Sequence, residues 1–142
     1  MGVMGHEQGA RERVASCLCG GLKVTTRGEP LDVYLCSCKD CQRGTGSAFS
    51  YGALFPEGSV GAAGESRTYR HYADSGRFID NVFCPICGTG VMFRAEGLPG
   101  AVGVSVGCFA DPDFAKPSKL YWASRRHRWL EPPSGVEPLD TQ

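Results

Sequence analysis

Three cysteines stand within six consecutive positions, at Cys36, Cys38 and Cys41, and no fourth cysteine or histidine follows them closely. Zinc bound by four protein side chains is a structural site, whereas zinc bound by three keeps a coordination position for water or substrate. The triplet therefore predicts an open metal site. This prediction constrains the fold, because the chain must bring three thiols to one point.

The other five cysteines form two pairs and a single residue: Cys17 with Cys19, Cys84 with Cys87, and Cys108. The two pairs together fill one tetrahedron. Adding the second pair to the triplet would instead give five ligands and leave the first pair without partners. We therefore expect a structural zinc on the two pairs and a second zinc on the triplet. The interval between the pairs exceeds that of an ordinary zinc ribbon, so the triplet is expected on an insertion between them.

The first pair and the second differ in local pattern. Cys17 and Cys19 are predicted at positions i and i+2 of a strand, on one face, where their sulfurs can lie about 3.8 Å apart as ligands of one zinc. Cys84-Pro85-Ile86-Cys87-Gly88 is typical of a zinc knuckle. Its proline presets a turn, and its glycine permits the positive φ that turns backbone N–H groups towards the sulfurs.

Eight cysteines in 142 residues fit either a secreted disulfide protein or an intracellular metal protein. Residues 1–14 are polar and lack the apolar run of a signal peptide, and no later segment approaches a membrane span. This predicts a cytoplasmic protein with reduced thiols and no membrane contact. The balance of 15 Lys and Arg against 15 Asp and Glu argues against nucleic acid as a partner.

The expected fold is all-β, because 20 glycines and 9 prolines divide the chain into short runs rich in Val, Tyr, Phe and Thr. We expect a disordered leader at residues 1–13, one zinc-binding domain at 14–133 and a flexible tail at 134–142. Ser37 is expected to cap a short helix that ends at Gly44-Thr45-Gly46. The predicted strands are residues 14–19, 22–26, 31–35, 49–55, 68–72, 77–83, 91–94, 101–106 and 119–123.

An alternative is a closed second site, in which Cys108, His71 or His127 supplies a fourth ligand to the triplet. The protein would then be a non-catalytic binding module with two structural zinc sites. The alternation after Ala101 predicts Cys108 in a row of valines, as a core residue. His71 is expected to point outward from its strand, and His127 lies among arginines, which argues against both as ligands.

Three thiolates cancel the charge of Zn²⁺ and leave a centre with a formal charge of about −1, which is a weak Lewis acid for water. An added thiol is a better partner, because zinc lowers its pKa while the sulfur stays nucleophilic. The predicted chemistry is the addition of a thiol to an electrophile such as an aldehyde.

Several motifs resemble the glutathione-dependent formaldehyde-activating enzyme family, which also includes centromere protein V. They are Cys17-x-Cys19-Gly20, Cys36-x-Cys38-x-x-Cys41 with Gly46, Gly64-Glu65 before Tyr69, Phe83-Cys84-Pro85-x-Cys87-Gly88-Thr89, and the later Asp111-Pro112, Pro117 and Trp129. The resemblance implies a β-tent fold, a structural zinc on Cys17, Cys19, Cys84 and Cys87, and a catalytic zinc on Cys36, Cys38 and Cys41.

The resemblance also implies the condensation of formaldehyde with glutathione to S-hydroxymethylglutathione. The resulting expectation is a zinc-dependent carbon-sulfur lyase that acts on a small thiol and an aldehyde, with Arg43 binding a carboxylate of glutathione. Two positions depart from the family pattern, because Ser37 and Leu120 stand where members commonly have histidine. Neither change removes a thiol ligand.

Overall fold

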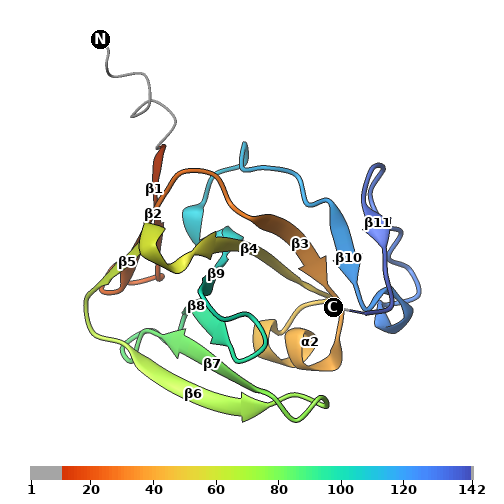
Figure 1. Ribbon diagram of the computed structural model, residues 1–142, viewed down its shortest axis with the longest axis horizontal. Helices are drawn as coiled ribbons and strands as arrows, with labels where there is room; N and C mark the ends of the chain where they lie inside the picture. Colours follow the sequence, from red (N-terminus) through yellow and green to blue (C-terminus); the bar gives the residue numbers. More distant parts are fainter. Residues whose placement is uncertain (1–10, 142) are drawn as a thin grey trace.

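The computed structural model describes residues 11–141, which form short β-strands, one α-helix and three turns of 3-10 helix (Figure 1). The elements are β1 (Glu12–Ser16), β2 (Lys23–Arg27), β3 (Asp32–Cys36), α2 (Lys39–Thr45), β4 (Ser50–Pro56), η1 (Glu57–Ser59), β5 (Val60–Ala63), β6 (Arg67–Tyr72), β7 (Phe78–Phe83), β8 (Gly90–Ala95), β9 (Ala101–Ser105), η2 (Val106–Phe109), β10 (Lys119–Tyr121), η3 (Ala123–Arg125) and β11 (Glu137–Pro138). The predicted all-β class with a short helix after the cysteine triplet is confirmed. None of the helices in this range is long and apolar enough to cross a membrane.

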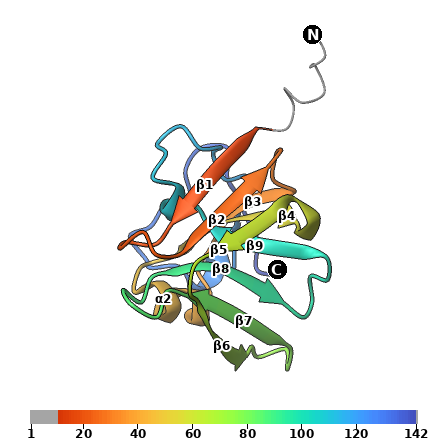
Figure 2. The same cartoon turned by 90° about the vertical axis from the view of Figure 1, so that its left-hand side faces the viewer.

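The strands form two sheets. A three-stranded antiparallel sheet has the order β1-β2-β5, and an eight-stranded sheet has the order β11-β10-β3-β4-β9-β8-β7-β6. The larger sheet is antiparallel from β3 to β6, whereas β10 runs parallel to both β3 and β11. Figure 2 shows the smaller sheet in front of the larger one.

The main hydrophobic core lies between the two sheets. Leu22 and Val24, from the smaller sheet and its turn, pack in one cluster with Ala53, Val104 and Val82 of the larger sheet. Successive side chains of a strand point to opposite faces, so the alternate residues of the same strands lie on the other face of the larger sheet. That second face carries Tyr34 and Cys36 of β3.

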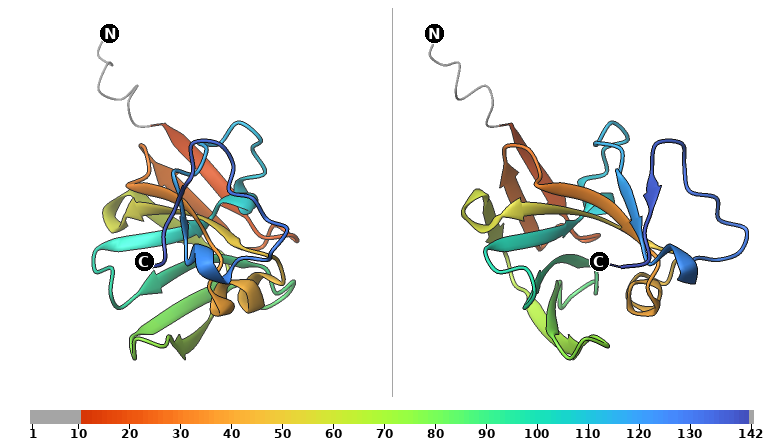
Figure 3. Two further views of the ribbon diagram at one scale, coloured as in Figure 1. Left: turned by 90° about the vertical axis from the view of Figure 1, so that its right-hand side faces the viewer. Right: turned by 45° about the vertical axis from the view of Figure 1, so that its right-hand side comes forward.

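The two chain ends differ from the sequence prediction. The leader predicted for residues 1–13 lies largely outside the described residues, and β1 already begins at Glu12. The segment predicted as a flexible tail supplies β11, and Val136 is buried with Leu120 and Ala123 in a second small core. The Leu139 N–H also donates to the Leu120 carbonyl at 3.0 Å. This segment therefore completes the edge of the larger sheet (Figure 3).

Candidate metal centres

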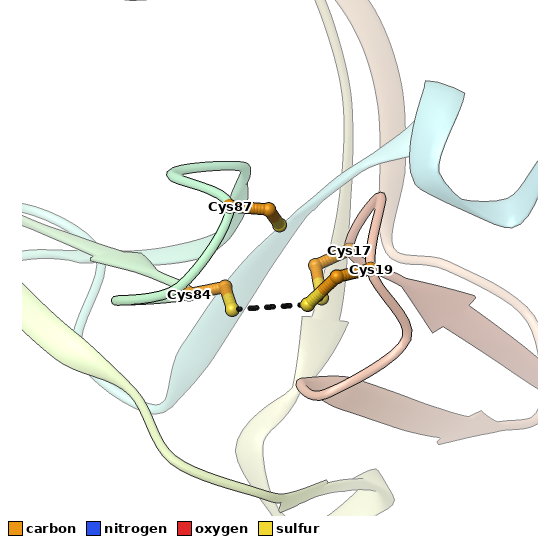
Figure 4. Close-up of side chains that lie close together, drawn as sticks. All are labelled: Cys17, Cys19, Cys84 and Cys87. Atoms are coloured by element: carbon orange, nitrogen blue, oxygen red, sulfur yellow. Dashed lines mark hydrogen bonds between the residues drawn. The ribbon is translucent and has the colours of Figure 1, made fainter.

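The first cysteine cluster joins two turns that lie far apart in the sequence (Figure 4). β1 ends at Ser16, so Cys17 and Cys19 lie in the turn after the strand and not on the predicted strand itself. Cys84 and Cys87 follow the end of β7, in the predicted knuckle. Gly88 adopts φ +81°, as the knuckle requires.

The sulfur positions fit one metal ion. The Cys17 and Cys19 Sγ atoms lie 3.7 Å apart, the Cys19 and Cys84 Sγ atoms also lie 3.7 Å apart, and all four sulfurs are within 4.8 Å of one another. Tetrahedral zinc with bonds of about 2.3 Å separates its sulfur ligands by about 3.8 Å. These thiols are free, and their separation is far above a disulfide bond of about 2.05 Å. The cluster can therefore hold a metal ion and is consistent with zinc.

Local donors favour the thiolate form, which metal binding requires, at two of the four cysteines, Cys17 and Cys87. At Cys19 the Gly21 backbone N–H lowers the pKa, but the hydrogen bonds with Cys17 and Cys84 raise it more, to about 11. The Leu22 N–H donates to Cys17 Sγ at 3.2 Å and lowers the pKa of that thiol. The Thr89 hydroxyl lies 3.2 Å from Cys87 Sγ and lowers the pKa of Cys87 to about 5. Thr89 Oγ1 also accepts a hydrogen bond from the Leu18 N–H at 3.1 Å, so it connects the two turns of the cluster.

The second cluster forms where β3 leads into α2. Cys36 is the buried last residue of β3, and Cys38 and Cys41 lie in the first turn of the helix, with all three sulfurs within 4.8 Å. Cys38 is the N-cap, because its Sγ accepts a hydrogen bond from the Cys41 N–H at 3.3 Å. The prediction that Ser37 caps this helix is wrong. Ser37 stands one position too early, and its buried hydroxyl donates to the Ala48 carbonyl at 3.2 Å.

The cysteines of the triplet differ in pKa. Hydrogen bonds from the Cys36 and Cys41 thiols lower the pKa of Cys38 to about 2. The same contact with Cys38 raises the pKa of Cys36, which is fully buried. Cys38 is thus the first thiolate of the cluster. This donor set suits a thiophilic metal such as zinc.

None of the three residues considered as a fourth ligand joins the triplet, and within residues 11–141 no further Cys, His, Asp or Glu does so. Cys108 is half-buried and packs beside the main core, where burial and the thiols of Cys17 and Cys87 raise its pKa. It therefore neighbours the other cluster. The predicted continuation of the valine strand to Cys108 is wrong, because β9 ends at Ser105 and η2 begins at Val106.

The two histidines contact the helix, not the sulfurs. His71 Nε2 lies 3.5 Å from Asp40 Oδ2, so the expectation that His71 points outward is wrong. Its strand, β6, is the edge of the curved sheet, and the inner side of that edge faces α2 (Figure 1). His127 Nε2 lies 3.0 Å from Gln42 Oε1. The triplet therefore remains a cluster of three ligands.

Comparison with known proteins identifies the family. The model of a family described as glutathione-dependent formaldehyde-activating enzyme matches residues 12–125. The chain belongs to this family. Membership suggests an enzyme of the glutathione-dependent, aldehyde-activating kind, and the two cysteine clusters of this family member lie within the matched residues.

A solved structure supports the fold of this family member. The crystal structure of a Rhodobacter sphaeroides protein, a structural genomics target, matches with a TM-score of 0.55 and 17% identity, over 89% of this chain and 98% of that one. At this identity the likeness shows the fold alone. A comparison with curated proteins finds no match.

Two residues near the triplet, Tyr34 and Gln42, were not identified from the sequence as parts of the site. Tyr34 lies two residues before Cys36, which on an extended strand places both on one face, and this period of two could have identified it. Gln42 donates from Nε2 to the Ser37 carbonyl at 2.8 Å and to the Arg125 carbonyl at 2.9 Å. It thereby fixes α2 against the segment after β10 (Figure 3).

Arg43, the residue expected to bind glutathione, lies exposed in the last turn of α2. In the part of the chain that the structure describes, no carboxylate forms an ion pair with it. Its guanidinium is therefore available to a ligand.

Proposed function

We propose that the protein is a zinc-dependent carbon-sulfur lyase that adds the thiol of glutathione to formaldehyde or a related aldehyde. The observation that carries the proposal is the cluster of Cys36, Cys38 and Cys41, which no fourth ligand closes within residues 11–141. Family membership supports the same chemistry. The proposal places the protein in a reducing compartment, the cytoplasm, where thiols remain available.

The two clusters take different roles in this proposal. Cys17, Cys19, Cys84 and Cys87 would hold a structural zinc that joins the two turns, and Cys36, Cys38 and Cys41 would hold the catalytic zinc. Zinc bound by three thiolates supplies a position at which an added thiol loses its proton yet stays nucleophilic. The binding energy of the first zinc is part of the folding energy, whereas the second serves the reaction.

The reaction is a balanced addition. The glutathione sulfur forms a bond to the carbonyl carbon, the π pair of the C=O bond moves to oxygen, and the proton given up by the thiol is replaced by one on that oxygen. No redox partner is needed. Arg43 would bind a glutathione carboxylate, because a guanidinium offers two parallel N–H donors to a carboxylate.

The experiment measures metal content and catalysis on the same sample. We expect two zinc equivalents per chain, one with three sulfur ligands by X-ray absorption, and faster exchange between formaldehyde and its glutathione adduct by NMR. Cys41→Ser should abolish the acceleration. Cys108→Ala is the matched control, because Cys108 belongs to neither cluster, and it should retain the acceleration.

Arg43→Ala tests the carboxylate contact separately. We expect it to raise KM for glutathione about tenfold with little change in kcat, because the contact is present in both ground and transition states. Arg67→Ala, an exposed arginine on β6, is the control and should leave KM unchanged. Two closed four-sulfur sites and no acceleration would instead support the binding module.

A further inference from the structure

We infer that Tyr34 is a further catalytic residue, whose hydroxyl donates a hydrogen bond to the aldehyde oxygen as that oxygen gains negative charge. This inference rests on the proposed function. It is carried by the position of the side chain, its free donor and the packing that fixes its ring.

The register of the sheet places Tyr34 beside the triplet. Tyr34 and Cys36 point to the same face of β3, and Tyr34 pairs with Gly52 of β4. A Cβ at Gly52 would lie 2.7 Å from Tyr34 Oη and 2.8 Å from Cζ. The ring therefore lies across the backbone of Gly52, and only a glycine at this position leaves space for the hydroxyl.

The hydroxyl has no partner of its own. Tyr34 is only 4% exposed, yet no hydrogen bond from its hydroxyl is found within residues 11–141. The hydroxyl groups of two other tyrosines in the larger sheet are paired. Tyr51 donates to the Ala115 carbonyl at 2.6 Å, and Tyr121 donates to Asp32 Oδ2 at 2.9 Å. Within residues 11–141, the buried side-chain atoms without a partner belong to Arg13, Thr26 and His71, so the Tyr34 hydroxyl is not sealed from solvent. Its unused donor can therefore meet a ligand held at the neighbouring triplet.

The ring is held in place before any ligand binds. The Tyr34 and Tyr121 ring centroids lie 5.4 Å apart at 60°, and Tyr121 is itself anchored through Asp32. A donor that is already oriented needs no rearrangement when charge develops on the substrate, and this is the condition under which such donors accelerate reactions most.

The proposed step uses the phenol of Tyr34 only as a hydrogen-bond donor. The step requires no ionisation of the phenol. The sulfur bonds to the carbonyl carbon, the π pair moves to oxygen, Tyr34 donates a hydrogen bond to that oxygen, and a solvent proton completes the adduct.

The first test is Tyr34→Phe in the zinc-loaded full chain. The variant keeps the ring, so we expect two zinc equivalents, an unchanged KM for glutathione, and a kcat for formaldehyde exchange about 100-fold lower. Tyr51→Phe is the matched control, because it also removes one tyrosine hydroxyl from the sheet. It should keep the wild-type kcat.

The second test measures binding without turnover. S-acetylglutathione and S-ethylglutathione have similar shapes, but only the first has an oxygen on the carbon next to sulfur. By calorimetry we expect the wild type to bind the acetyl compound about fivefold more tightly, as one hydrogen bond provides. Tyr34→Phe should bind the two equally.

The outcomes separate the two proposals. An active wild type with an equally active Tyr34→Phe variant, or a preference for the acetyl compound that survives in that variant, overturns the role of Tyr34 alone. Loss of one zinc equivalent in Tyr34→Phe also overturns it, because the residue would then support the metal and not the substrate. A wild type that does not accelerate the exchange refutes the lyase and the role of Tyr34 together.

Discussion

Substitution of Gly103 by alanine should destabilise the domain through one identifiable clash. Gly103 is buried in β9 and pairs with Phe93 of β8, whose ring lies across the glycine backbone. An added Cβ would lie 2.7 Å from Phe93 Cδ1 and closer still to Cε1 and Cζ. The ring cannot stay in place, because carbon atoms not bonded to each other pack at about 3.5–4.0 Å.

The expected cost follows from what the ring must do. Forcing a packed side chain from its position costs about 1–3 kcal/mol. For a domain of this size, each kcal/mol lowers Tm by about 3–4 °C. We therefore expect Gly103→Ala to melt roughly 3–12 °C below the wild type in circular dichroism, with an unchanged far-ultraviolet spectrum at 20 °C.

The control is Gly61→Ala, which also adds a methyl group to a strand glycine but has no atom within 4 Å of the new Cβ. It should match or exceed the wild-type Tm. Phe93→Leu in the Gly103→Ala background should recover part of the loss, since the two sites are in contact. Equal Tm values for Gly103→Ala and Gly61→Ala would refute the placement of the Phe93 ring.

Three further predictions concern the clusters. A chelator or acid should remove the triplet metal before the four-thiol metal, because three ligands hold it, and zinc release in one step with unfolding would contradict this order. Cys87→Ser should abolish folding, whereas Cys38→Ser should give a folded chain with one zinc, which gel filtration and metal analysis will distinguish. Cys108→Ala should keep both zinc ions and lower stability by about 1 kcal/mol in urea unfolding, and loss of one zinc would assign Cys108 to a site.

Residues close in sequence were the most predictable part of this protein. The grouping of the cysteines into two pairs and a triplet followed from spacing, because a turn or a strand end fixes the distance between neighbouring thiols. The union of the two distant pairs in one cluster followed from counting the four ligands of a closed zinc site. The N-cap was misplaced by one residue. Ser37 is the better capping residue by type, but Cys38 occupies the position at which a side chain can accept the Cys41 N–H.

Features set by distant packing were not predictable in this way. β5 reads Val-Gly-Ala-Ala, a sequence with little strand preference, and it forms because β2 offers a free edge. Nothing in the sequence around Val136 indicates that this residue is buried with Leu120 in the second small core. His71 faces α2 only because β6 is the last strand of a sheet that curves round the helix. Each of these depends on tertiary contacts that local pattern does not contain.

Thr89 shows how a residue that binds no metal can set the acid stability of a metal site. Its hydroxyl lies 3.2 Å from Cys87 Sγ and is the largest cause of the low pKa of that thiol, about 5, to which the backbone N–H groups of Thr89 and Cys19 also contribute. The Thr89 oxygen also accepts a hydrogen bond from the Leu18 N–H. Thr89→Val keeps the β-branched shape and removes both contacts. The pKa of Cys87 should then rise, while the backbone donors of Thr89 and Cys19 still hold it below the ordinary cysteine value.

The direction of the pH effect follows from competition between protons and metal for the sulfur. A thiol with a lowered pKa stays ionised until the pH falls towards that value, so it keeps its metal in more acidic solution. With the pKa raised, protons displace the metal at higher pH. We expect the midpoint of zinc release from the four-thiol cluster, followed with a chromogenic chelator, to move upward in Thr89→Val. The triplet zinc in the same sample and a Thr68→Val variant on exposed β6 serve as controls. An unchanged midpoint for the four-thiol cluster would show that the hydroxyl does not govern the ionisation of Cys87.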